Sequence, residues 1–122
     1  MTDRHRLASV VILSSLLAGC GSSDAGPVPA APPAAELGER TWKRICAECH
    51  DGGLGDAPAI GDRDAWRPRL AQGKDVLLQH ALNGFTGGIG EMPPRGGDDS
   101  LSDDEVEAAL AYMIAASESP SE

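Results

Sequence analysis

Two thiols and an imidazole within five residues constrain this chain more than any other feature. Cys46 and Cys49 are separated by two residues, and His50 follows directly. Two thiols one turn apart on a helix can add to the two vinyl groups of a haem, and the adjacent imidazole then lies under the iron. The pattern therefore predicts one covalent haem c, attached through Cys46 and Cys49, with His50 as an iron ligand.

The same spacing also occurs in redox-active dithiols, in partial zinc sites and by chance. A structural zinc site needs two further ligands, and the sequence contains no second pair of closely spaced cysteines. An export signal and a loop methionine elsewhere in the chain favour the haem interpretation.

Residues 1–19 have the features of a lipoprotein signal peptide. A basic start precedes an apolar run from Leu7 to Ala18, which is too short for a bilayer-spanning helix of roughly 20 residues. Residues 17–20 resemble a lipobox, in which Cys20 is acylated and becomes the first residue of the mature protein. An ordinary signal peptide, cleaved nearby to leave a free thiol, is the alternative. Gly21 slightly favours the outer membrane, so we expect a lipid-anchored protein on the periplasmic side of the cell envelope.

The rest of the chain divides by composition. Residues 20–35 contain the lipidated cysteine and a flexible tether rich in Gly, Ser, Ala and Pro. Residues 36–117 form one small domain, and residues 118–122 form a disordered tail. A domain of this size usually needs a staple in addition to its core. Haem would provide that staple, and the apo form should be poorly folded.

The formal net charge of −9 bears on partners. It argues against binding to nucleic acid and against attraction to anionic lipid. It suggests a redox partner with a basic docking surface, facing acidic residues near the expected haem edge such as Glu91, Asp98 and Asp99. The alternative is that acidity merely keeps an exported protein soluble.

Four helical segments are expected, over residues 36–48, 62–72 and 74–82 and from Ser102 onward. Ser102 and Glu105 form a capping box at the start of the last helix. Gly38 and Trp42 share one face of the first helix, so the first and last helices should cross near Gly38. Pro68 should lie near the start of its helix or at an irregular turn. No segment shows a strand pattern, so the fold class is all-α.

Residues 84–97 are rich in glycine and read as a loop that contains Met92. Two prolines follow Met92 and restrict its backbone, so its sulfur is available to a metal. His80 is a less suitable second iron ligand, because a histidine on a helix at this position is usually a surface or core residue. Met113 lies in the apolar stripe of the last helix and reads as core.

The chain resembles class I c-type cytochromes, and more closely the bacterial cytochrome c5 branch. The resemblance spans residues 36–116 and rests on five motifs, which are Cys46-Ala47-Glu48-Cys49-His50, Ala57-Pro58-Ala59-Ile60-Gly61-Asp62, Trp66-Arg67-Pro68-Arg69, Met92-Pro93-Pro94-Arg95-Gly96-Gly97, and Ser102-Asp103-Asp104-Glu105 with Ala111-Tyr112-Met113. It implies a small cytochrome c fold of about four helices around one covalently bound haem.

The resemblance also implies roles for individual residues. His50 and Met92 would be the axial ligands, and the Pro58 carbonyl would accept a hydrogen bond from the far nitrogen of His50. Trp66 and Arg69 would be candidates for contact with the haem propionates. Relatives in the c5 branch often have a cysteine pair after Met-Pro-Pro, which this chain lacks.

Iron with two protein ligands has no vacant site for a substrate, so the expected function is to carry single electrons between redox protein partners, not to catalyse a reaction. Histidine and methionine ligands favour a relatively high potential. One alternative is a haem-based small-ligand sensor or peroxidase in which Met92 is labile. Another is the haem subunit of a larger oxidoreductase.

Overall fold

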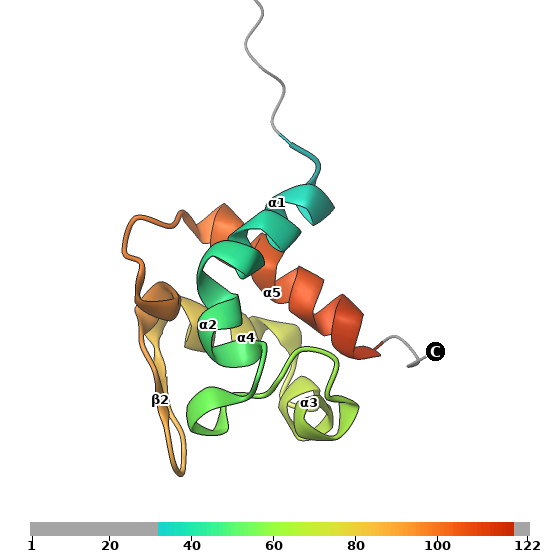
Figure 1. The fold of residues 1–122 in the computed structure, drawn as a ribbon, viewed down its shortest axis with the longest axis vertical. Helices are drawn as coiled ribbons and strands as arrows, with labels where there is room; N and C mark the ends of the chain where they lie inside the picture. Colours follow the sequence, from blue (N-terminus) through green and yellow to red (C-terminus); the bar gives the residue numbers. More distant parts are fainter. Residues whose placement is uncertain (1–31, 119–122) are drawn as a thin grey trace, which may run out of the picture. The chain divides into compact units, whose positions relative to one another are not determined.

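The computed structural model describes residues 32–118, and the expected signal peptide, Cys20 and most of the expected tether lie outside them. The described part is mostly helical, as predicted, with one two-stranded sheet (Figure 1). No helix within these residues is both long and apolar enough to cross a bilayer. The elements, in chain order, are α1 (Ala34–Thr41), the π-helical turn η1 (Trp42–Cys46), α2 (Ala47–His50), the 3₁₀ turn η2 (Leu54–Asp56), α3 (Arg63–Leu70), α4 (Lys74–Asn83), β1 (Phe85–Thr86), β2 (Glu91–Met92), the 3₁₀ turn η3 (Pro94–Gly97) and α5 (Asp103–Glu118).

The first expected helix is present and longer than predicted. Helix α1, η1 and α2 follow one another without a break, so helical structure runs from Ala34 to His50. The π-helical turn between them ends at Cys46. Such turns are rare and occur frequently at functional sites, and no sequence pattern indicated this one.

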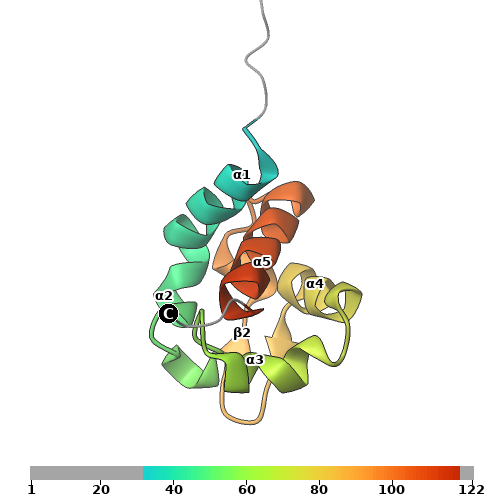
Figure 2. The ribbon, with the colours of Figure 1, turned by 90° about the vertical axis from the view of Figure 1, so that its right-hand side faces the viewer.

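Helices α1 and α5 cross at Gly38, as predicted (Figures 1 and 2). Gly38 is buried against the backbone of Ala108, and a Cβ there would lie 3.1 Å from the Cβ of Tyr112. The ring of Trp42 packs against that of Tyr112, with 5.6 Å between the ring centroids. A glycine and an aromatic pair thus bring the two helices into close contact.

The expected capping box begins α5. The carboxylate of Glu105 accepts a hydrogen bond from the Ser102 backbone N–H at 2.9 Å, and the Ser102 hydroxyl accepts one from the Glu105 N–H at 3.3 Å. Leu101, just before the cap, and Val106 are both buried in one cluster. The helix start and its hydrophobic staple are therefore confirmed.

The middle of the chain differs from expectation at two places, and at the first of them, Pro68, the expectation was wrong. Pro68 is the sixth residue of α3 and lies inside the helix, rather than in its first turn. Proline lacks the N–H that the Asp64 carbonyl would otherwise accept. In the same helix the Arg69 side chain donates to the neighbouring Ala65 carbonyl at 2.6 Å.

The second difference is the small hairpin in the loop over residues 84–97. Strands β1 and β2 pair in antiparallel fashion, with Phe85 opposite Met92, and Gly87 donates to the Gly90 carbonyl at 2.9 Å to close the turn. Each strand has two residues, which is too short to show an alternating pattern. We call residues 85–92 the methionine hairpin.

Two buried clusters form the core. Met113, on α5, lies in the first cluster, as predicted, and is 4% exposed. The second cluster joins α4 to the start of α5. The first consists of Trp66, Leu77, Leu110, Met113 and Ile114, and the second of Ala81, Leu101 and Val106.

Candidate haem site

The two thiols and the imidazole lie at the end of the first helical segment. Cys46 ends η1, and Cys49 and His50 lie on α2. Both thiols are free and half-buried, while His50 is buried. Cys46 packs against the first core cluster, so the attachment motif is joined directly to the protein core.

A loop holds the histidine from two sides. In this histidine loop, residues 57–61, the Pro58 carbonyl lies 2.9 Å from Nδ1 of His50, and the Ile60 N–H donates to the His50 carbonyl at 2.7 Å. A carbonyl only accepts, so Nδ1 carries the proton and Nε2 is left as the electron-pair donor. This arrangement is typical of a histidine that binds a metal through Nε2.

The histidine loop is itself tied to two helices. Trp66, which is 3% exposed, donates from its indole N–H to the Ala59 carbonyl at 2.8 Å. The Gly61 N–H donates to the buried Ser117 hydroxyl at 3.0 Å, and that hydroxyl donates to the Met113 carbonyl at 2.7 Å. The sequence did not indicate Ser117, since a serine near the end of a helix has no distinguishing pattern.

Burial sets the protonation of the site. It lowers the pKa of His50, and the positive charge of Arg69 lowers it further, against the opposing effect of the Pro58 hydrogen bond. The imidazole is therefore held neutral, as a metal ligand must be. Burial also raises the pKa of the Cys46 thiol. The attacking thiol of a redox-active dithiol has a lowered pKa, so the shift at Cys46 is in the opposite direction.

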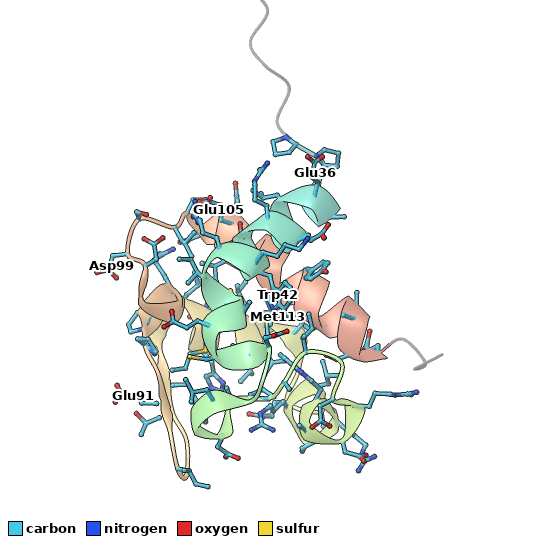
Figure 3. The ribbon with its side chains drawn as sticks, viewed as in Figure 1. Glu36, Trp42, Glu91, Asp99, Glu105 and Met113 are labelled. Carbon is cyan, nitrogen blue, oxygen red and sulfur yellow. The ribbon has the colours of Figure 1, made fainter. Side chains whose placement is uncertain are left out.

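The methionine hairpin is anchored near the same helical segment. Met92 is half-buried and packs against the second core cluster, as does Ile45, which immediately precedes Cys46. Directly after the hairpin, Gly96 of η3 also approaches Ile45, since a Cβ there would lie 3.0 Å from the Ile45 side chain. The fold therefore packs Met92 and the residue before the first thiol on one cluster. Side chains of this region are shown in Figure 3.

Three other candidates have defined surroundings. The His80 ring stacks on Phe85 with 4.3 Å between the centroids. The Trp66 N–H is bonded to the histidine loop, so Trp66 contributes an aromatic surface near His50. The ring centroids of Trp66 and His50 are 6.5 Å apart. One guanidinium nitrogen of Arg69 is engaged by Ala65.

These residues fit a covalently bound haem. Two free thiols and a neutral, oriented imidazole form the required donor set. Within residues 32–118, no three His, Cys, Asp or Glu side chains are grouped to hold a metal ion on their own. Within the same residues the one buried side-chain N/O atom without a hydrogen-bond partner is Nε1 of Trp42, on the thiol-bearing segment. Such a donor is commonly satisfied by water or a bound group.

Comparison with known proteins supports the same conclusion. Residues 33–113 match the family described as cytochrome C oxidase, cbb3-type, subunit III. A cytochrome c-555 of Chlorobaculum tepidum is 42% identical over 80 residues, which are 66% of this chain and 74% of that protein. A cytochrome c5 of Azotobacter vinelandii is 38% identical over 81 residues, which are 65% of this chain and 93% of that protein.

A solved structure is similar as well. It is described as an electron transfer complex of nitrite reductase with cytochrome c, and the matched chain is 42% identical, with a TM-score of 0.59. The match covers 66% of this chain and 94% of that chain. The chain therefore belongs to the class I c-type cytochromes, is similar to cytochrome c5, and is an electron carrier with one covalently bound haem c.

Proposed function

We propose that this cytochrome carries single electrons between redox proteins at the bacterial envelope, with its iron held between His50 and Met92. Cys46 and Cys49 would attach the haem. The hydrogen bond from His50 Nδ1 to the Pro58 carbonyl, 2.9 Å long, carries this proposal, because it leaves Nε2 to bind iron. Bound haem c supplies one-electron exchange between ferric and ferrous iron.

The protein's contribution is to orient the iron ligands and to enclose the haem. The histidine loop fixes the ring of His50 through Pro58, and Trp66 supports that loop through Ala59. Trp66 and Arg69 remain proposed haem-binding residues, Trp66 through its ring and Arg69 through its charge, which acts on His50. A neutral thioether from Met92 would complete the iron's ligands and favour the ferrous form.

The location of the protein is also a proposal. A lipidated Cys20 and the tether after it would keep the carrier at the envelope, with the outer membrane slightly favoured, while the domain samples its partners. The matches to small cytochromes, which cover 74% and 93% of those proteins, favour an independent carrier over a haem subunit of a larger oxidoreductase.

The optical spectrum of the mature haem protein, oxidised and then reduced, tests this proposal. We expect low-spin ferric iron with the weak far-red charge-transfer band of a methionine sulfur ligand. Met92→Ala should abolish the band, lower the potential and let cyanide or carbon monoxide bind. In Met113→Leu the band should persist, because Met113 is a core residue that is 4% exposed.

Two results would reject His/Met ligation. One is a wild-type protein that lacks the band, has high-spin ferric iron and binds cyanide freely, which would indicate the sensor or peroxidase function. The other is a far-red band that survives in Met92→Ala, which would assign the ligand to a different residue.

The acidic surface should make electron exchange depend on salt. Glu91 and Asp99 are exposed, and both lie on the left of Figure 3. Asp98 is less available, because its carboxylate accepts from Ser100 and lies 3.8 Å from Arg44. We expect exchange with the cation hexaammineruthenium to slow severalfold as salt rises from about 10 to 150 mM, and exchange with ferricyanide to accelerate.

A charge-matched pair of variants locates the effect. Glu91→Gln should weaken the salt dependence more than Asp64→Asn, because Asp64 lies on α3 and pairs with Arg67. Equal rates at all salt concentrations, for both the cation and the anion, would rule out a basic docking surface on the partner.

A further inference from the structure

The methionine hairpin and the loop after the haem histidine touch through two glycines. A Cβ on Gly90 would overlap the carbonyl oxygen of Gly55 and would lie 3.0 Å from its carbonyl carbon. Both contact groups are backbone, so neither can move aside as a side chain would. The two segments are therefore in contact at a point that admits no side chain on Gly90.

The loop side of the contact has a specific backbone conformation. Gly53, Gly55 and Asp56 all have positive φ, at 73°, 62° and 67°. Left-handed backbone at three of the four residues 53–56 turns the chain sharply between α2 and the histidine loop. The Ala57 N–H donates to the Leu54 carbonyl at 3.1 Å and closes this turn, which presents the Gly55 carbonyl to the hairpin.

The hairpin needs external support. Two paired residues in each strand are too few to be stable alone. Its base is held by the contact of Phe85 with His80 and by Met92 in the second core cluster. Near its tip, where Ile89 is 84% exposed, the backbone contact at Gly90 is the support.

Gly90 lies two residues before Met92, and Gly55 lies five residues after His50. A shift of the hairpin at Gly90 would therefore be transmitted along one short strand to the methionine. We propose that the Gly55–Gly90 contact is a clamp between the two ligand-bearing segments and that Gly90 is a positioning residue for Met92. This inference rests on the proposed ligation of iron by Met92.

The clamp would act on the sixth ligand rather than on the attachment of haem. With the clamp closed, the thioether is held at the iron and the protein is a carrier. With the clamp opened, the methionine leaves more often and small ligands gain access. The contact would thus determine how readily small ligands reach the iron.

Gly90→Ala in the holoprotein tests the clamp. We expect a weaker far-red band and cyanide binding to ferric iron that is faster by about tenfold or more, because overpacking against backbone would destabilise the hairpin position that holds Met92. Gly88→Ala is the matched control in the same turn, because nothing lies within 4 Å of its Cβ position and its φ is not positive. Ser102→Ala is a second control, since it removes the cap of α5 and lowers the melting temperature.

Both controls should retain the band and the slow cyanide rate of the wild type. If Gly90→Ala also retains them, the clamp is wrong while Met92 ligation stands. If Ser102→Ala changes them as much as Gly90→Ala does, the effect is general destabilisation and the clamp is wrong. If the wild type has no band, the proposed ligation and the clamp are both wrong.

Hydrogen exchange of the wild-type holoprotein covers the case in which Gly90→Ala does not accumulate. The Gly87 amide, bonded to Gly90, reports opening of the hairpin, and the Ala57 amide, bonded to Leu54, reports opening of the turn. A clamp predicts that both amides open together, with the same dependence on low denaturant. Exchange of Gly87 more than about tenfold faster than that of Ala57 would reject it.

Discussion

Gly38→Val is expected to destabilise the folded domain by about 3 kcal/mol or more, which is roughly 12 °C or more in melting temperature for a domain of this size. The first added carbon would overlap the Ala108 carbonyl oxygen and lie 2.8 Å from its carbonyl carbon. Backbone cannot rotate away, so α1 and α5 must separate. Separation would also break the contact of Trp42 with Tyr112.

Gly38→Ala should show a smaller effect of the same sign. The methyl group meets the same carbonyl, but alanine gains up to about 1 kcal/mol of helix propensity over glycine. We therefore expect a net loss of about 1–2 kcal/mol. Thermal unfolding of the holoproteins, followed by far-UV circular dichroism, measures both variants.

Gly52→Ala is the control for these two variants. Nothing lies within 4 Å of a Cβ at Gly52, and its φ is not positive. The expected change is neutral or slightly stabilising, because alanine restricts the unfolded chain. A Gly38→Val protein that melts within about 2 °C of the wild type would show that the crossing is not a tight backbone contact.

The helix crossing and the last helix could be predicted because their signals are local. Gly38 and Trp42 are four residues apart and therefore share a face, and Ser102 and Glu105 have the spacing of a capping box. Both features depend on spacing within one helix. The structure places them where this spacing implies.

Features that depend on distant contacts could not be predicted in this way. The π-helical turn at Trp42–Cys46 has no local signature. The position of Pro68 inside α3 also has no local signature, because a proline within a helix leaves the carbonyl four residues earlier without its backbone donor. The methionine hairpin depends on Gly90 meeting Gly55, a pair separated by 35 positions in the chain.

The candidate site was accessible from the sequence for a different reason. Cys46, Cys49 and His50 lie within five consecutive residues, and the chemistry of haem attachment requires this spacing. The Pro58 contact followed from resemblance to known cytochromes, and the structure contains it. The hydrogen bonds that support the histidine loop could not be predicted, because they join residues that only the folded chain brings together. In these bonds Trp66 donates to the Ala59 carbonyl, and the Gly61 N–H donates to the Ser117 hydroxyl.

Replacing both thiols, in Cys46→Ala with Cys49→Ala, is expected to leave a chain without covalent haem and with most of its helical signal lost. A single core in a domain this small rarely supplies more than about 3–5 kcal/mol. Cys46 and Met92 pack against different core clusters, so a haem attached at Cys46 and bound by Met92 would join the two. Leu78 already packs against both clusters, but without haem Cys46 and Met92 would lose the group that links them.

Mass spectrometry of the denatured chain and far-UV circular dichroism measure this outcome. Each single variant should retain haem through one thioether and fold, with a lower melting temperature. Ile45→Val is the packing control, because it removes one carbon beside Cys46 and should cost about 1 kcal/mol with haem fully retained. If the double variant unfolds cooperatively near the wild-type temperature, haem is not the staple, and the two clusters together suffice to fold residues 32–118.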